Sequence, residues 1–187
     1  MNHHQIVELQ KRIGATPDGF FGPKSIRACK DHLRGLMPVD HPWPTQDQGA
    51  LTRFYGRPGE ESMLVNLAVG DLDIRYDGKN VKSIRCHHKV APSLRRVLEN
   101  IAKTPHAWVL KEYAGCYNNR PMRGGSLPSL HARGAAIDLA PSTNQLREHW
   151  PSSANMPIEV MEIFAREAWL PAGAFWSRDG QHFQATR

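Results

Sequence analysis

The stretch Ser129–Leu139, with the sequence SLHARGAAIDL, carries residue types that can do chemistry together. His131 stands seven residues before Asp138, and Gly134 lies between them. A glycine lets the chain turn tightly before the apolar run that carries the aspartate. Such a turn can bring an imidazole and a carboxylate to one point. These are nitrogen and oxygen ligands that zinc accepts.

A second stretch near the C-terminus, Trp176–Gln184, supplies a further histidine in a strand-like run. This residue is His182, and Asp179 lies three positions before it. A catalytic zinc site takes three protein ligands and leaves one position open. A bend at Gly180 can aim the acid and the histidine at one centre. The candidate zinc ligands are therefore His131, Asp138 and His182.

The pattern SxHxxGxAxDL, followed by DxxHF, resembles the zinc peptidases of the D-alanyl-D-alanine carboxypeptidase / L-alanyl-D-glutamate endopeptidase group. These enzymes cut peptidoglycan and share the hedgehog/DD-peptidase fold, and many phage endolysins belong among them. The resemblance runs from about residue 65 to the end of the chain. It implies an α+β domain with a small antiparallel sheet, flanking helices and a zinc cleft. The alternative is a core histidine and a capping aspartate that share this spacing by chance.

The resemblance also implies a role for Asp179. Zinc lowers the pKa of a bound water to about 7 and polarises a carbonyl. Asp179 would accept the proton of that water and pass it to the leaving amine. The base of related enzymes is a Glu or an Asp, so Asp179 fits. Gln181 is a mild departure, because a Met often precedes the last ligand.

Five further residues are expected around the substrate. Related peptidases carry an arginine after a Gly-Tyr turn, and Arg120 fits this position best. Its guanidinium can hold a substrate carboxylate or the oxyanion, although Arg123 can exchange roles with it. Ser129 would alternate to the side of His131 and contact substrate or the ligands. The residues expected to wall the cleft are Trp176 and Phe183.

The N-terminal pattern LQ…DGxFGPxSxxA resembles the helical peptidoglycan-binding module that is often fused to wall hydrolases. Helices are predicted over 5–13 and from Pro23 to Gly35, with a turn-rich loop between them. The expected wall-binding residues are Asp18, Gly19 and Phe21. The alternative is a helical hairpin that only packs on the catalytic domain.

These patterns divide the chain into three parts: a wall-binding-like module at 1–38, a linker with a short helix at 39–62, and the catalytic domain at 63–187. Thr45–Gln48 reads as a capping box that opens the linker helix, and Gly56 ends it. In the catalytic domain a hairpin turn is predicted at Asp77-Gly78, and a helix from Ser93. Another helix is expected after Met156-Pro157. Strands are predicted over 81–86, 107–113, 173–176 and 181–185.

Other polar residues have less specific interpretations. His87 and His88 are adjacent, so in a strand they point to opposite faces, and a solvated or partly packed pair is expected rather than a metal site. Asn144 can orient the site or simply turn the chain. The three cysteines form an odd set without a CxxC pair, which favours reduced thiols. Cys116, near the proposed site, is expected to be a small buried residue.

The composition is that of a soluble globular protein, with 40% hydrophobic and 22% charged residues among 187. The net charge of +6 favours an anionic partner. There is no compact Lys/Arg run, so nucleic acid is not expected as a partner. Peptidoglycan is anionic and suits the motifs better. No apolar run approaches membrane-spanning length, and no signal-peptide pattern opens the chain.

The sequence therefore predicts a monomeric, bacteriolytic zinc metallopeptidase of the endolysin type that degrades the cell wall. It would cut the stem peptide of bacterial peptidoglycan at the L-alanyl-D-glutamate bond. The alternatives are a D-alanyl-D-alanine carboxypeptidase and a non-catalytic wall-binding protein. By analogy with phage lysins, the protein would be made in the host cytoplasm and act in the periplasm or cell wall after release.

Overall fold

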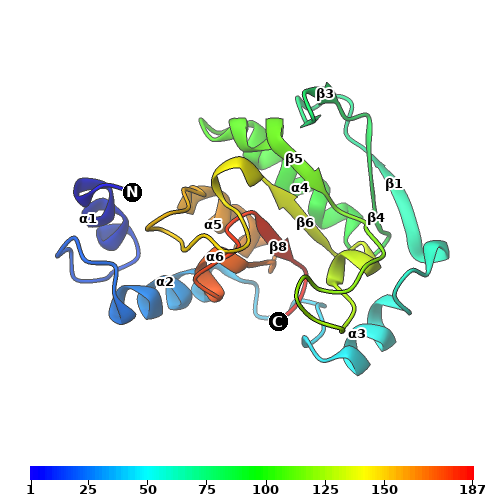
Figure 1. Ribbon diagram of the computed structural model, residues 1–187, viewed down its shortest axis with the longest axis horizontal. Coiled ribbons are helices and arrows are strands. Elements are labelled where there is room, and N and C mark those ends of the chain that lie inside the picture. The colour runs from blue at the N-terminus through cyan, green and yellow to red at the C-terminus, as the bar shows by residue number, and fades with distance from the viewer.

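The computed structural model describes residues 1–187 and has an α+β fold, as predicted (Figure 1). The helices are α1 (His3–Arg12), α2 (Pro23–Leu36), α3 (Gln48–Tyr55), α4 (Ala91–Ala102), α5 (Ile158–Arg166) and α6 (Ala172–Phe175). The strands are β1 (Leu64–Ala68), β2 (Arg75–Tyr76), β3 (Lys79–Asn80), β4 (Ser83–His87), β5 (Tyr113–Gly115), β6 (Ala136–Leu139), β7 (Leu170–Pro171) and β8 (His182–Gln184). Short 3₁₀ helices are η1 (Glu61–Met63), η2 (Ala107–Glu112), η3 (Leu130–Arg133) and η4 (Pro141–Thr143). None of the helices combines the length and the apolar character needed to cross a membrane.

A four-stranded antiparallel sheet, in the order β5-β6-β8-β7, lies at the centre of the molecule (Figure 1). In the register between β6 and β8, Asp138 faces His182 and Ile137 faces Phe183. Side chains alternate between the two faces of a strand. Ile137 and Phe183 therefore point together into the core, where both are fully buried. The same alternation places Asp138 and His182 side by side on the other face.

Helix α4 forms because apolar residues recur at helical spacing, and the structure confirms this prediction. Leu94, Val97, Leu98 and Ile101 are all fully buried. The helix begins at Ala91, two residues before the predicted start at Ser93. The hydroxyl of Ser93 instead accepts a hydrogen bond from the indole of Trp169 at 2.9 Å. The apolar stripe thus predicts the core face correctly but not the first turn.

Two predicted strands are wrong. Most of 107–113 forms the 3₁₀ helix η2, and only Tyr113 enters β5. The segment 173–176 belongs mainly to helix α6, and the neighbouring strand is β7. Short apolar runs do not distinguish a strand from a buried helical turn. At Gly173 a Cβ atom would lie 3.1 Å from the Cα of Gly180, so this helical turn packs closely on the loop before β8.

The ends of the early helices differ in detail from the prediction. Helix α2 starts with Pro23 in its first turn, as predicted, but continues through Gly35 and ends before Met37, which precedes a proline. Asp47, rather than Thr45, caps α3: its carboxylate accepts a hydrogen bond from the backbone N–H of Ala50 at 2.8 Å. Gly56 ends this helix as predicted.

The hairpin prediction at Asp77-Gly78 is confirmed, since both residues have positive φ between β2 and β3. The expectation of a solvated or partly packed pair at His87 and His88 is confirmed, since His87 is buried and His88 is exposed. Their rings nevertheless stack with centroids 4.5 Å apart and do not point to opposite faces, and it is His87 that is fully buried. Its Nε2–H donates to the carbonyl of Tyr55 at 3.1 Å. Burial lowers the pKa of His87 to about 4, so the ring is neutral.

All three cysteines are free and buried, as the odd count suggested. Burial raises the pKa of Cys29 and Cys86 to about 12 and that of Cys116 well above its ordinary value. A thiol with a raised pKa is a poor nucleophile and a poor metal ligand. The cysteines therefore act as small apolar residues.

The N-terminal helices share one hydrophobic core with the rest of the chain. Leu9 of α1 and Leu33 of α2 belong to the same buried cluster as Trp43 and Tyr55 of the following segment and Phe164 of α5. Helix α2 packs against α5 and α6. In Figure 1, α1 lies at the edge of the molecule, beyond α5. The core is thus continuous across the three predicted parts of the chain.

An ion-pair network ties α1 and α2 to α5. The guanidinium of Arg12 donates to both carboxylate oxygens of Glu162 at 2.8 and 2.7 Å, and to Glu159 at 2.7 Å. The Nε2–H of His32 donates to Glu162 at 2.8 Å. Burial alone would raise the pKa of Glu162, but these hydrogen bonds lower it below the ordinary 4.5. The network therefore stabilises the ionised form of Glu162.

Glu162→Gln should lower the free energy of unfolding at pH 7 by about 1–3 kcal/mol, because it weakens charged hydrogen bonds at a nearly buried position. A carboxyl group whose pKa falls on folding stabilises above its unfolded pKa and loses this effect as the pH falls. The difference between wild type and variant should therefore shrink below pH 4.5. Urea unfolding at pH 7 and at acidic pH measures it. Glu8→Gln, which breaks the exposed pair with Lys11, is the control and should change little.

Candidate metal centre and catalytic pocket

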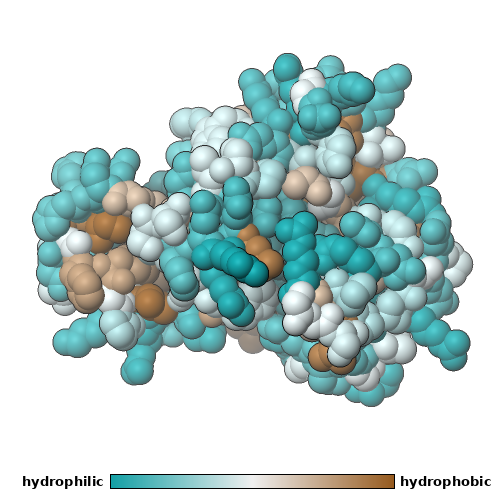
Figure 2. All heavy atoms as spheres, in the orientation of Figure 1, coloured by the Kyte–Doolittle hydropathy of each residue, from teal (hydrophilic) through white to brown (hydrophobic).

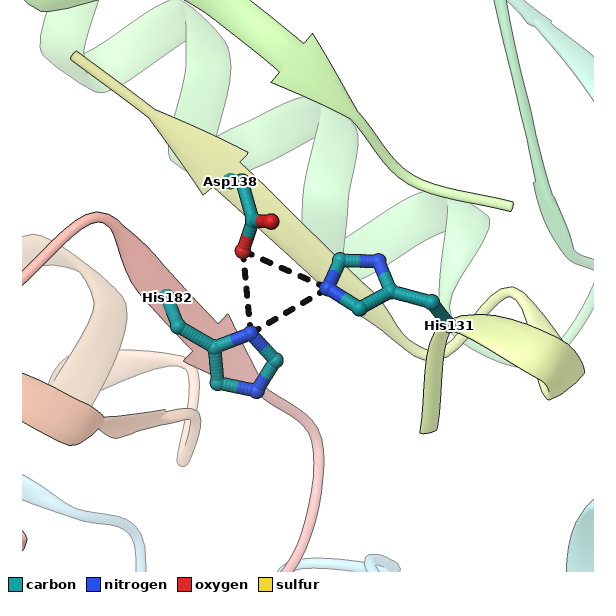
Figure 3. A group of neighbouring side chains, drawn as sticks. All are labelled: His131, Asp138 and His182. Atoms are coloured by element: carbon teal, nitrogen blue, oxygen red, sulfur yellow. Dashed lines mark hydrogen bonds and ion pairs between the residues drawn. The ribbon is translucent and has the colours of Figure 1, made fainter. Parts of the chain in front are cut away.

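Three side chains converge on one face of the central sheet (Figure 3). His131 Nε2 lies 3.2 Å from His182 Nδ1 and 3.2 Å from Asp138 Oδ1. His182 Nδ1 lies 2.9 Å from the same oxygen. Each residue thus directs one possible ligand atom at a shared centre. The structure brings the predicted zinc ligands together.

Local structure fixes the position of each ligand. His131 lies on η3, whose first turn is capped by Ser129, and Gly134 ends this turn in the left-handed conformation with φ 63°. A Cβ on Gly134 would approach the backbone nitrogen of His87 to 2.8 Å, so only glycine fits. Gly134 therefore makes the predicted turn into β6. Asp138 and His182 then meet through the register of β6 and β8.

The outer nitrogen of each histidine has its own partner. His131 Nδ1–H donates to the carbonyl of Cys116 at 2.7 Å, and His182 Nε2–H donates to the amide oxygen of Gln184 at 3.2 Å. Gln184 in turn donates to the hydroxyl of Thr186 at 2.6 Å. Such partners hold the tautomer that leaves the inner nitrogen unprotonated. In that tautomer, both inner nitrogens can offer lone pairs to a cation at the centre.

This donor set fits zinc. Two imidazole nitrogens and a carboxylate oxygen face each other at 2.9 to 3.2 Å, an arrangement that a cation would stabilise. Ligand atoms about 2.1 Å from a tetrahedral zinc lie about 3.4 Å from each other, close to the observed separations. Burial would raise the pKa of Asp138, but its hydrogen bonds with His131 and His182 lower it well below the ordinary range. Burial would likewise lower the pKa of His182, but the neighbouring Asp138 raises it. Asp138 is therefore ionised, as a ligand must be.

Asp179 lies beside this centre and outside the group of three donors. It occupies the turn before β8, in which the backbone N–H of His182 donates to the Asp179 carbonyl at 3.0 Å. The positive φ of this turn is at Asp179 itself, with φ 60°, and not at Gly180. The side chain of Gln181 donates to the Asp179 carboxylate at 3.1 Å. The acid is thus held at the rim of the same pocket as the three donors.

The pocket in front of the donors has a volume of about 390 Å³. Arg120 and Arg123 both line it, and neither forms an ion pair with an acidic side chain. Trp176 forms part of the wall, with its ring centroid 6.1 Å from that of His182. Figure 2 shows that hydrophilic residues dominate the visible face of the molecule. Because Arg120 and Arg123 have no acidic partner, the pocket can bind an anionic group next to the three donors.

Two expected substrate contacts need correction. Phe183 does not wall the pocket: it is fully buried and stacks on Phe164 at 3.8 Å, because neighbouring strand residues face opposite sides. Ser129 lines the pocket but does not alternate with His131, since η3 is helical. Its hydroxyl accepts the backbone N–H of His131 at 3.3 Å. Ser129 therefore orients the turn that carries a ligand.

The sequence interpretation missed three contributors. Gln184 lies two residues after His182, so strand alternation alone would place it on the ligand face. Arg178 lines the pocket and stands between Trp176 and Asp179 in the same motif. The backbone carbonyl of Cys116 could not be found by residue type, because any residue carries one.

Asn144 organises the loops around the site. It is fully buried, its side chain bonds the backbone nitrogens of Asn155 and Met156, and its carbonyl accepts the N–H of Gln181 at 3.0 Å. A Cβ on Gly180 would lie 2.9 Å from the Asn144 side-chain oxygen. Asn144 therefore supports the turn before β8 and does not line the pocket.

The three residues expected to bind the wall lie in an ordered loop between α1 and α2. The Asp18 carboxylate accepts hydrogen bonds from Gln10 at 2.8 Å and from the N–H of Phe20 at 2.9 Å. Gly19 has φ 77° and donates to Gln10 at 2.8 Å. Phe21 packs edge-on against Trp150 at 5.5 Å. These contacts shape the loop, at whose tip Phe20 is 73% exposed.

Residues 123–185, about a third of the chain, match the sequence model of the family described as D-alanyl-D-alanine carboxypeptidase. The matched segment contains the three donors and Asp179. No curated protein and no solved structure matches the chain. The family match and the donor cluster together support a metallopeptidase that acts on peptidoglycan.

Proposed function

We propose that this protein is a zinc-dependent, endolysin-like peptidase that cuts the stem peptide of bacterial peptidoglycan at the L-alanyl-D-glutamate bond. The observation that carries this proposal is the convergence of two imidazole nitrogens and a carboxylate oxygen in an arginine-lined pocket. His131, Asp138 and His182 would hold the zinc ion. The α+β fold and the family match are compatible with the hedgehog/DD-peptidase type of cleft.

A bound zinc ion supplies Lewis-acid chemistry, which strengthens water as a nucleophile and polarises a peptide carbonyl. Asp179 accepts the proton that the attacking water loses and delivers it to the leaving amine. Its turn before β8 keeps the carboxylate at the rim of the pocket. Arg120 stabilises the negative charge that develops on the carbonyl oxygen, and Arg123 binds a substrate carboxylate.

A second candidate is D-alanyl-D-alanine carboxypeptidase activity, which the description of the matched family favours. A carboxypeptidase must bind the terminal carboxylate of its substrate, and the pocket arginines suit that group. The two activities leave different products. An endopeptidase leaves L-alanine on the glycan, whereas a carboxypeptidase releases free D-alanine.

Digestion of purified sacculi by the zinc-loaded protein, followed by mass spectrometry, tests the proposal. We expect glycan strands that carry a single L-alanine, together with free peptides that begin with D-glutamate. Release of D-alanine alone would establish the carboxypeptidase instead. If neither product forms while the protein binds sacculi, the chain is a non-catalytic wall-binding protein.

We propose that the loop between α1 and α2 contributes to wall binding, as the N-terminal resemblance implies. The largest group of hydrophobic residues in Figure 2 lies over this part of the molecule. Phe20 is the most exposed aromatic side chain there and can stack on a sugar ring. Deleting residues 1–38 is a poor test, since it would remove part of the shared core. A point variant avoids this problem.

Phe20→Ala should weaken binding to sacculi by about 1 kcal/mol, roughly fivefold, because an exposed stacking surface is lost. Hydrolysis of soluble wall peptides should not change. A pull-down with purified sacculi, run beside peptide hydrolysis, measures both effects. Val65→Ala, which truncates another exposed hydrophobic residue outside both the pocket and the cavity beside it, is the control. Equal binding by Phe20→Ala and wild type would leave the loop with a packing role only.

The proposed function also predicts where the protein acts. Its substrate lies in the bacterial wall, so the protein must reach the periplasm or the wall after synthesis in the host cytoplasm. The proposal includes a monomeric protein with peptidoglycan as its partner, and neither nucleic acid nor membrane insertion.

A further inference from the structure

A second cavity, of about 530 Å³, adjoins the catalytic pocket. Gln46 and Trp176 line both cavities and form the boundary between them. One wall comes from α2 and the segment that follows it, and the other from β7, α6 and the C-terminal residue. Figure 1 shows the C-terminus beside the segment after α2, and the backbone of Arg187 bonds Pro44 at 3.0 Å. The cavity therefore lies where the N-terminal helices meet the site.

The charged residues of this cavity are all basic. Lys30, Arg34 and Arg187 line it, and none of its 11 lining side chains is acidic. His41 also lines it, but burial and the charge of Arg187 lower the pKa of this ring, so it is a neutral polar group. We call this cavity the basic groove. Lys30 and Arg34 are four residues apart on α2 and so lie on one face of the helix. Arg34 has one ion pair, an exposed contact of 3.4 Å with Asp31. Clustered positive charges attract an anion.

The groove also has fixed donors and an apolar floor. The guanidinium of Arg34 lies over the ring of Phe175 at 5.3 Å, which holds this side chain against α6. The buried Nδ1 of His41 has no hydrogen-bond partner in the protein. Leu170 and Met37 contribute apolar surface. This combination suits a peptide that carries a carboxylate better than a free inorganic ion.

We propose that the basic groove binds a carboxylate of the peptidoglycan stem peptide, outside the residues that flank the cut bond. This proposal rests on the proposed function. A peptide held at the zinc ligands that extends past Trp176 enters the groove directly, because the two cavities share this wall. Stem peptides carry carboxylates along their length, so Lys30 and Arg34 would fix the register of the substrate. The continuity of the two cavities favours the peptide over a separate phosphate-bearing polymer.

The test compares the variant Lys30→Gln/Arg34→Gln with wild type as zinc-loaded, full-length proteins. The substrates are a tetrapeptide muropeptide from purified sacculi and the same compound with its carboxyls converted to amides. Lys24→Gln/Arg27→Gln removes two exposed charges from the same helix outside the groove and is the control. For the free-acid substrate we expect the groove variant to raise KM roughly five- to tenfold, with kcat within about twofold of wild type.

The amidated substrate completes a double-mutant cycle, in which the protein charges and the substrate carboxylates are removed separately and together. Wild type should bind it more weakly, and the groove variant should add little further loss, because the carboxylate partner is already absent. Equal KM values for both variants and wild type on the free-acid substrate would overturn the inference. So would an unchanged KM together with weaker binding of the groove variant to a soluble teichoic acid, which would assign the groove to phosphate.

A binding measurement distinguishes failure of the proposed function from failure of the groove proposal. If wild type does not cut the muropeptide, calorimetry of the same muropeptide with wild type and both variants replaces the kinetic comparison. A Kd raised only in the groove variant would still support the carboxylate site. Equal Kd values would reject it, whatever the chemistry at the zinc ligands.

Discussion

Asp179→Asn should retain zinc and the fold but lose roughly 10²–10⁴-fold in hydrolysis rate, the usual contribution of a positioned general base. The side chain keeps its shape but can no longer accept the proton. Asn tolerates the left-handed backbone conformation of this position, and its oxygen can still accept the hydrogen bond from Gln181. The loss should therefore be in kcat. Steady-state hydrolysis of muropeptides, together with metal analysis and circular dichroism, measures these effects.

Asp77→Asn is a matched control for this variant. Asp77 also has positive φ, with 49°, but it lies in the exposed β2–β3 turn away from the pocket. This variant should keep full activity. Near-normal hydrolysis by Asp179→Asn, or its failure to hold zinc, would contradict the assignment. Glu148 and Glu167 would then be poor substitutes, since neither lines the pocket and Glu167 pairs with Arg96 at 2.7 Å.

His182→Ala and His131→Ala should each abolish stoichiometric zinc binding and reduce hydrolysis to background. Removing a residue that only orients a ligand typically costs 10–100-fold in metal affinity, so removing a ligand itself should cost more than about 100-fold. Wild type should hold one zinc per chain. Dialysis against a zinc buffer followed by elemental analysis gives the stoichiometry without reference to activity.

Asp138→Asn should also lose metal affinity, because an amide oxygen lacks the negative charge that the carboxylate offers. His88→Ala is the control for the histidine variants, since His88 is exposed and does not belong to the donor cluster. It should bind zinc and hydrolyse muropeptides normally. Full zinc content in both His131→Ala and His182→Ala would place the metal elsewhere.

Local sequence patterns were sufficient to predict those elements whose conformation depends on neighbouring residues in the chain. The apolar stripe of α4, Pro23 at the start of α2 and the Asp77-Gly78 hairpin follow from short-range preferences. The two wrong strands, at 107–113 and 173–176, lie in short apolar runs. Such runs are compatible with several backbone conformations. Packing against neighbouring segments chooses between them, and this information is absent from the run itself.

In the candidate site, too, local sequence determined some features and tertiary structure decided others. Residue types and spacing within two motifs determined which side chains could be zinc ligands and which acid stood near them, because ligand chemistry depends on residue identity. Only the tertiary structure decided which nitrogen of each histidine faces the centre. That choice depends on the carbonyl of Cys116 and on Gln184.

Other features were decided by tertiary structure alone, because they depend on contacts between segments far apart in the chain. Phe183 points into the core since β8 pairs with β6 in one register, and a shift by one residue would exchange it with His182. Arg12 reaches Glu162 only because α1 lies against α5. Lys30 and Arg187 are 157 positions apart in the sequence and line one groove. Spacing along the chain carries no information about such pairs, so no motif could have revealed the groove beside the pocket.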